Sequence, residues 1–320
     1  MRILFVTATR IGDAVLSTAV LRHLLDRHPG AALTIAAGPA AAPLFEAVPG
    51  LERILVLDKR RYGLHWLALY RQVAARHWGL VVDLRGSGLA YLLWARERRI
   101  MAKGDPAEHR VQQLARLFAL DPPPAPRLWL APRHRQAAAE LVPPGGLVLA
   151  IGPAANWRGK QWRAERFAAL AQRLVAASGP LPGARVAVLA GAHERAQAAP
   201  VLAALPEGQC LDLIGRTDLL TAAAALERCA LFIGNDTGVM HIAAAMGIPT
   251  LGLFGPSRPE HYAPWGPLTA VVRTERSYAE IVNAPGYDYR TADTQMDSLS
   301  IDAAEAAARR LWSSVSGKAA

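Results

Sequence analysis

The residues from Gly234 to His241 offer the clearest chemistry in the chain. They read Gly-Asn-Asp-Thr-Gly-Val-Met-His and lie between an apolar run at 231–233 and small helix-forming residues at 242–246. This order predicts a strand, a polar loop and the start of a helix. Unpaired N–H groups and the helix dipole favour an anion at a helix N-terminus. We therefore expect this turn to hold phosphate.

The spacing within the turn adds to that expectation. Thr237 and His241 are four residues apart and share a helix face, and Asp236 directly precedes them. All three side chains could face one ligand. The same residue types also suit a structural interpretation, with Thr237 as a helix cap, Asp236 as a turn former and His241 in the core. This segment alone leaves both interpretations open.

A carboxylate follows the first apolar run of the chain. Residues 7–13 read Thr-Ala-Thr-Arg-Ile-Gly-Asp and precede a helical pattern. The single glycine does not match the G-x-G-x-x-G pattern of dinucleotide-binding folds. Asp13 is expected at a helix N-terminus, where its ionised form is favoured and is available as a general base. An ordinary acidic cap is the alternative.

A basic loop opens the second half of the chain. Residues 152–162 are rich in glycine and hydrogen-bond donors, and they follow a predicted strand at 147–151. Lys160 is well placed in this loop to meet a phosphate. The structural alternative is a solvated lysine, because most lysines lie on the surface.

Short apolar runs alternate with helical patterns along the whole chain, which predicts parallel sheets flanked by helices. A proline-rich stretch at 121–144 interrupts the alternation, and the same pattern then restarts. We expect an α/β protein of two doubly wound domains, residues 1–143 and 144–320, the second ending in a helix. Ligands bind outside the carboxyl ends of such strands, so two domains of this kind predict a cleft between them.

Composition limits the class of protein. The 320 residues are 52% hydrophobic and carry 36 Lys and Arg against 26 Asp and Glu, a net charge of +10. This balance favours a phosphorylated substrate, nucleic acid or an anionic membrane surface. Cys210 and Cys229 have no metal-ligand spacing, so we expect core residues in a reducing compartment. No signal peptide, membrane span or metal-binding motif is evident, which predicts a cytoplasmic protein without a metal.

Together the motifs resemble glycosyltransferase family 9, the bacterial lipopolysaccharide heptosyltransferases. The resemblance covers nearly the whole chain: Arg-Ile-Gly-Asp at 10–13, Asp-Leu-Arg-Gly-Ser at 83–87, His-Arg-Val at 109–111, the loop from Asn156 to Trp162, Gly-Ala-His-Glu-Arg at 191–195, Asn-Asp-Thr-Gly at 235–238 with His241, and Phe-Gly-Pro-Ser at 254–257. The family often has Thr or Ser where this chain has Ala155-Asn156, and frequently has Thr where it has Ser257.

The resemblance implies the GT-B architecture of two Rossmann-like domains. It also implies metal-independent inverting transfer from a nucleotide diphosphate sugar, with no further cofactor, and a donor bound mainly by the C-terminal domain. By the same resemblance, Asp13 and Lys160 are the catalytic pair, with Asp13 as the base and Lys160 holding the diphosphate. The remaining donor-binding residues would be Asn156, Asp236, Thr237, Gly238 and His241, with Glu194 at the ribose.

The acceptor site is predicted in the N-terminal half. Gly12 lies beside Asp13, and the cluster Lys59-Arg60-Arg61 fits an anionic acceptor, although a solvated basic turn fits equally well. The expected reaction moves a sugar, heptose from ADP-heptose, onto a lipid-linked core oligosaccharide at the inner face of the inner membrane, with peripheral membrane contact. A nucleotide-sugar epimerase is the alternative enzyme. A nucleic-acid-binding module is the alternative from another class, but no basic helix or zinc-finger pattern supports it, so nucleic acid is not an expected partner.

Overall fold

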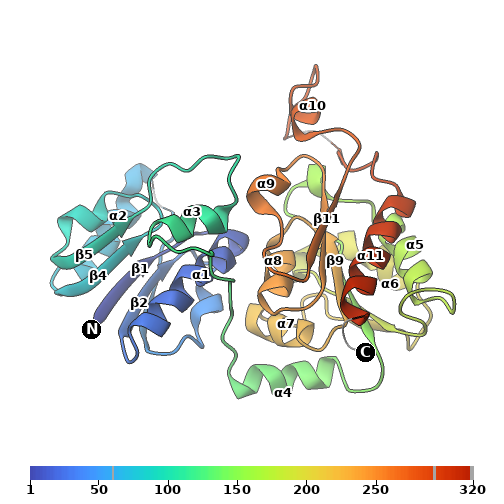
Figure 1. Ribbon diagram of the computed structural model, residues 1–320, viewed down its shortest axis with the longest axis horizontal. Helices are drawn as coiled ribbons and strands as arrows, with labels where there is room; N and C mark the ends of the chain where they lie inside the picture. The colour runs from blue at the N-terminus through green and yellow to red at the C-terminus, as the bar shows by residue number, and fades with distance from the viewer. Residues whose placement is uncertain (60, 291–292, 318–320) are drawn as a thin grey trace. The chain divides into compact units, whose positions relative to one another are not determined.

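The computed structural model describes residues 1–59, 61–290 and 293–317. These residues form two compact units, Met1–Ala131 and Pro132–Ala320 by their bounds, each built around its own parallel sheet. Figure 1 shows the units in blue to green and in green to red.

The N-terminal unit contains a five-stranded parallel sheet in the order β3-β2-β1-β4-β5. Its central strand β1 pairs with β2 on one side and with β4 on the other. The elements in chain order are β1 (Arg2–Val6), α1 (Ile11–Arg27), β2 (Ala32–Ala37), η1 (Ala42–Phe45), β3 (Leu51–Val56), η2 (Arg61–Gly63), α2 (Leu64–Val73), β4 (Trp78–Asp83), η3 (Leu89–Leu92), β5 (Ala95–Ile100) and α3 (Arg110–Arg116).

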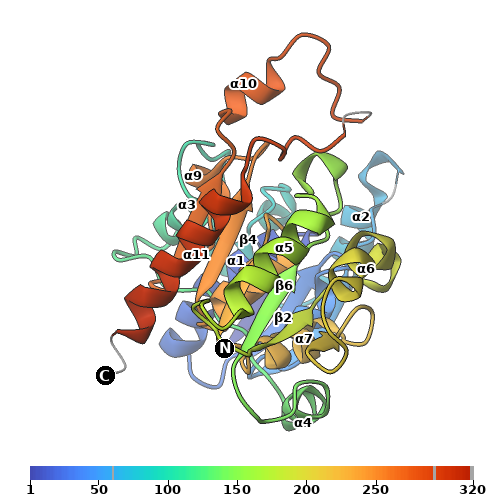
Figure 2. The ribbon, with the colours of Figure 1, turned by 90° about the vertical axis from the view of Figure 1, so that its right-hand side faces the viewer.

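The C-terminal unit contains a six-stranded parallel sheet in the order β11-β10-β9-β6-β7-β8. Helices α5 and α11 lie side by side against it, and α10 extends away from the sheet (Figures 1 and 2). The elements are α4 (Pro132–Leu141), β6 (Val148–Gly152), η4 (Arg158–Lys160), α5 (Ala164–Val175), β7 (Arg185–Val188), η5 (Ala192–Glu194), α6 (Arg195–Ala203), β8 (Cys210–Asp212), α7 (Leu219–Leu226), β9 (Leu231–Asn235), α8 (Gly238–Ala245), β10 (Thr250–Phe254), α9 (Pro259–Tyr262), β11 (Thr269–Arg273), α10 (Tyr278–Val282) and α11 (Ile301–Ser316).

The central predicted strands are present because their apolar side chains are buried on both faces of the sheet. Strands β6, β9 and β10 are buried at every position, as expected for central parallel strands. The α/β class and the two doubly wound sheets are therefore confirmed. Strand β5 was not predicted, because its sequence Ala-Arg-Glu-Arg-Arg-Ile is charged and exposed at the edge of the sheet.

The structural division falls at Ala131–Pro132, before the expected boundary at residue 143. The reason is helix α4, which lies within the proline-rich stretch and packs against α7. Arg135 also forms an ion pair with Glu227 at 3.1 Å, and Arg228 donates to the carbonyl of Val142 at 2.6 Å. These contacts place α4 with the C-terminal unit.

Candidate functional site

In both sheets the strand order reverses beside the first strand of the unit. In the N-terminal sheet β1 lies between β2 and β4, and in the C-terminal sheet β6 lies between β7 and β9. Loops leaving neighbouring strands on opposite sides of such a point diverge and leave room for a ligand at the carboxyl edge. The segments that contain Asp13, Lys160 and Asp236 all leave strands next to these two points.

Asp13 lies in the first turn of α1, after the loop that leaves β1. Its side chain is partly exposed, while the helix buries its next residues. Thr7, at the end of β1, hydrogen-bonds Ser17 at 2.7 Å inside the core. A Cβ at Gly38 would lie 2.5 Å from the Cα of Thr9, so glycine is required where β2 ends beside this loop. The loop before Asp13 is therefore held on both sides.

Asp83 supports the neighbouring loop of the same unit. Its side chain is fully buried at the end of β4, in register with Val6 of β1. One carboxylate oxygen accepts from the Arg85 N–H at 2.9 Å, and the other accepts from the Ser87 N–H at 2.9 Å and the Ser87 hydroxyl at 2.7 Å. The Asp-Leu-Arg-Gly-Ser motif at 83–87 therefore fixes the conformation of the loop that follows β4.

Lys160 and Asp236 meet across the reversal point of the C-terminal sheet. The Lys160 ammonium lies 2.5 Å from one oxygen of the Asp236 carboxylate, and the side chains are 24% and 6% exposed. His241 Nε2 lies 4.0 Å from the other oxygen. The structure therefore brings together three of the predicted donor-binding side chains, with the carboxylate between two nitrogen groups.

The loop that contains Lys160, residues 153–162, is called the lysine loop below. Asn235, the last residue of β9, is fully buried and bonds both ends of this loop. Its amide nitrogen donates to the Pro153 carbonyl at 2.8 Å, and its amide oxygen accepts from the Trp162 N–H at 3.1 Å. Sequence reasoning missed this role, although a polar residue ending an otherwise apolar strand was a usable signal.

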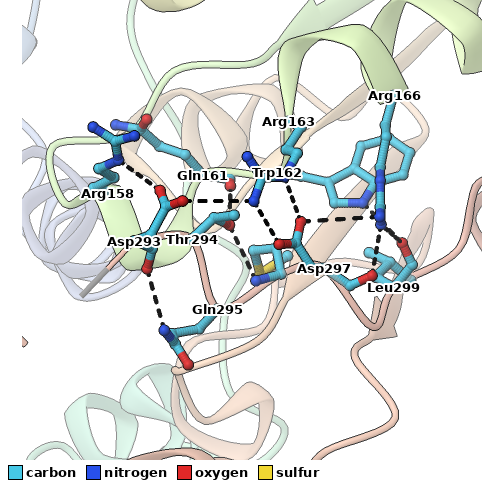
Figure 3. Close-up of polar contacts among 11 residues, drawn as sticks. Arg158, Gln161, Trp162, Arg163, Arg166, Asp293, Thr294, Gln295, Asp297 and Leu299 are labelled. Carbon is cyan, nitrogen blue, oxygen red and sulfur yellow. Dashed lines mark hydrogen bonds and ion pairs between the residues drawn. The ribbon is translucent and has the colours of Figure 1, made fainter. Parts of the chain in front are cut away.

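A second support for the lysine loop comes from residues 293–299, called the clamp below. Gln295 N–H donates to the Gly159 carbonyl at 3.0 Å, and the Thr294 hydroxyl donates to the Gln161 carbonyl at 2.5 Å. These two carbonyls flank Lys160 in the chain. The Trp162 indole N–H also donates to the Leu299 carbonyl at 3.0 Å. Figure 3 shows the clamp lying along the loop.

Ion pairs extend the contact between the clamp and the lysine-loop region. Arg158 pairs with Asp293 at 2.7 Å, and Arg163 pairs with Asp297 at 2.6 Å through two parallel hydrogen bonds (Figure 3). The hydrogen bonds from Arg158 and Arg163 lower the pKa of Asp293 and Asp297 respectively. Both aspartates therefore carry their charge at neutral pH. Since these pairs are exposed, each contributes little to stability.

The other predicted donor-binding residues occupy different positions at the same edge. Thr237 is the N-cap residue of α8 by backbone conformation, with no hydrogen bond from its side chain to the helix, and Gly238 is the first helical residue. Asn156 is exposed in the lysine loop. Glu194 accepts the Gly191 N–H at 2.8 Å and so caps its own turn after β7. The segments with Thr237, Asn156 and Glu194 follow β9, β6 and β7 respectively, which are adjacent strands of the sheet.

The predicted acceptor residues lie in the N-terminal unit. Gly12 is in the first turn of α1 beside Asp13. Lys59 and Arg61 are exposed after β3, and Arg60 lies outside the described residues. Asp13 belongs to one unit and Lys160 to the other, so their joint action in one reaction stays a prediction.

Within the described ranges, no three His, Cys, Asp or Glu side chains gather as a metal site would require. None of the helices in those ranges combines the length and apolarity needed to cross a bilayer.

The chain is 24% identical over 322 residues to lipopolysaccharide heptosyltransferase 2 of Salmonella typhimurium, covering 88% of this chain and 90% of that protein. It is 32% identical over 126 residues to lipooligosaccharide heptosyltransferase 2 of Haemophilus influenzae, a match that covers 38% of this chain and spans about a third (34%) of that protein. The E. coli ADP-heptose LPS heptosyltransferase II structure superposes with a TM-score of 0.74 at 18% identity, covering 100% of both chains.

The superposition over both sheets confirms the GT-B fold predicted from the sequence. The model of glycosyltransferase family 9 (heptosyltransferase) matches residues 63–285, which include the lysine loop and the turn after β9. The protein is therefore a glycosyltransferase, and the chain belongs to glycosyltransferase family 9.

Proposed function

We propose that this enzyme transfers heptose from ADP-heptose onto a lipopolysaccharide core acceptor, with inversion at the anomeric carbon and without a metal ion. Family membership supports the reaction class, and the names of the similar proteins specify heptose and lipopolysaccharide. The observation that best supports a diphosphate donor is the Lys160–Asp236 pair beside the N-terminus of α8.

This pair leaves the lysine able to bind a phosphate. An ammonium group has three N–H donors, and Asp236 accepts one of them. The others are available to phosphate oxygens, while Asp236 fixes the position of the ammonium group. The N-terminal N–H groups of α8 supply further donors and a favourable dipole. The site thus offers positive charge of fixed geometry.

In the proposed mechanism, Asp13 accepts the proton of the acceptor hydroxyl. That oxygen forms a bond to the anomeric carbon while the bond from this carbon to the diphosphate oxygen breaks. The electron pair leaves with ADP, and Lys160 and the α8 N-terminus stabilise the charge that develops there. A lysine–phosphate contact at ~4 Å has a Coulomb energy of about 4 kcal/mol at an effective dielectric of ~20, before the cost of desolvation. If half of this stabilisation acts only in the transition state, the rate rises about 30-fold.

Asp13→Asn tests the proposed base with almost no change in side-chain volume. We expect transfer from ADP-heptose to fall by about 10²–10⁴-fold, with donor affinity changed only a few-fold. Asp26→Asn is a matched control, because Asp26 is an exposed acid in the last turns of the same helix. Normal turnover in Asp13→Asn would show that Asp13 is not the general base.

Two further arms examine the rest of the proposal. Transfer measured with EDTA present should equal transfer without it if no divalent metal takes part. Incubation with donor alone should leave the sugar unchanged, whereas an isomerised sugar would favour an epimerase. The configuration of the new glycosidic bond, read by NMR, decides between inversion and retention.

A further inference from the structure

Three large apolar side chains stand exposed at one corner of the N-terminal unit. Tyr91, Leu92 and Trp94 are 71%, 69% and 74% exposed, at the end of η3 and just before β5. We call residues 91–99 the β5 corner. Clusters of such exposed side chains on a folded protein mark a contact surface, whereas single ones need no explanation.

The corner is held in shape by Arg98. Its guanidinium donates to the carbonyls of Ala90 at 2.8 Å, Leu93 at 2.6 Å and Ala95 at 3.1 Å. The side chains of these three residues are buried in the core of the unit. The three apolar side chains between them therefore stay outside on a fixed backbone, so their exposure is built into the fold.

Arginines follow these side chains directly in the chain. Strand β5 is the edge strand of its sheet (Figure 1). Arg96 and Arg99 are exposed along it, and the Arg99 guanidinium lies 3.7 Å from Glu97 and 5.9 Å from the centre of the Phe118 ring. Residues 1–131 contain 18 Lys and Arg against 10 Asp and Glu, a net charge of +8, while residues 132–320 contain 18 against 16, a net charge of +2. The basic balance of the chain is thus concentrated in the unit that contains the corner.

We propose that the β5 corner docks this enzyme onto an anionic phospholipid surface. Tyr and Trp favour the boundary between headgroups and acyl chains, where an apolar ring and a polar tip are both satisfied. Arginines beside them meet lipid phosphates. A second copy of the chain fits less well, because each edge strand carries three arginines and one glutamate, so pairing two copies would bring excess positive charge together. The inference deepens the proposed function, which supplies a lipid-linked acceptor.

Vesicle binding tests this inference without any substrate. The full chain is mixed with phosphatidylcholine vesicles with and without phosphatidylglycerol, and the bound fraction is measured by sedimentation. We expect Leu92→Ser with Trp94→Ser to weaken binding to the anionic vesicles at least about tenfold. Arg96→Gln and Arg99→Gln should each cost about fivefold at low salt, an effect that high salt removes.

Matched controls come from the C-terminal unit. Leu147→Ser removes an exposed leucine, 43% exposed, and Arg310→Gln removes an exposed arginine on α11. Both should bind vesicles like the natural chain. Circular dichroism melting of every variant separates lost binding from lost folding, and the exposed sites predict unchanged melting.

Two outcomes would overturn the inference. One is equal vesicle binding by the corner variants and the controls. The other is a dimer in lipid-free sedimentation that the corner variants dissociate, which would make the corner an interface between copies. Because vesicle binding needs no sugar donor, these outcomes are independent of whether heptose transfer is observed. If transfer occurs, the corner variants should lose it only with vesicle-embedded acceptor and keep it with a water-soluble, deacylated one.

Discussion

The substitution Asn235→Asp replaces the side-chain NH₂ group by an oxygen. The Asn235 side chain is fully buried and bonds both ends of the lysine loop. One oxygen of the new carboxyl still accepts the Trp162 N–H. The other replaces an N–H donor 2.8 Å from the Pro153 carbonyl oxygen. An ionised carboxylate there would face an acceptor without a proton between them, whereas the protonated acid restores the bond. Burial and this contact should both raise the carboxyl pKa in the folded state.

The sign of the pH effect follows from that shift. A group whose pKa is raised on folding binds more protons in the folded state, so stability falls as pH rises. The loss of unfolding free energy begins near the carboxyl pKa of the unfolded chain, about 3.9. It grows by about 1.36 kcal/mol for each pH unit until the pKa of the folded state is reached. If the folded pKa exceeds about 7, the variant loses about 4 kcal/mol between pH 4 and pH 7.

Urea unfolding at about pH 4 and about pH 7, followed by tryptophan fluorescence, measures this difference. Trp162 is 1% exposed and reports on the relevant unit. Asn156→Asp is the control, because Asn156 is exposed in the same loop and should show no such pH dependence. A variant that is destabilised equally at both pH values, or not at all, would refute the role given to the Asn235 amide.

Three other predictions concern the same unit. Thr294→Val removes the hydroxyl that bonds the Gln161 carbonyl, so the KM for donor should rise several-fold in steady-state assays with little change in kcat, and Thr294→Ser should restore it. Burial raises the pKa of the Cys229 thiol to about 12, so alkylation at neutral pH should be slow in the folded protein and fast in urea, as mass spectrometry would show. The hydrogen bond from Arg163 lowers the pKa of Asp297, so the pair stabilises the fold above the unfolded pKa of about 3.9. This stabilisation is lost as the pH falls through the lower pKa of the folded state. The melting temperature of Arg163→Gln should therefore be lower than that of the natural chain at neutral pH and equal to it in acid.

The central strands were predictable because they are buried on both faces, which leaves continuous apolar runs such as Leu231-Phe232-Ile233 in the sequence. The half-buried strand β11 was not predicted. The edge strand β5 was not predicted either, because one-sided exposure replaces the apolar run by charges. The helix expected at the end of the second domain is α11, which begins at Ile301 with Ser300 as its cap, since the Ser300 hydroxyl accepts the Ala303 N–H.

For the candidate site, local sequence patterns predicted the loops but not the long-range contacts that fix their conformation. The turn after β9 and Lys160 were found because strand, glycine-rich loop and helix follow one another in the chain. The Lys160–Asp236 contact spans 76 positions, and the contact between Thr294 and Gln161 spans 133, so no local spacing encodes either. Such contacts follow from the strand order, which places distant segments at one sheet edge.

The position of the clamp in the chain affects where a truncated version of this protein can end. The family model ends at residue 285, whereas the segment that bonds the carbonyls on both sides of Lys160 begins at Asp293. A fragment ended at residue 285 would keep every strand of the second sheet but lose α11, its packing on α5, and the backbone bonds to Gly159 and Gln161. Such a shortened protein would keep the contacts of Asp236 and Asn235 with the lysine loop and lose those of the clamp.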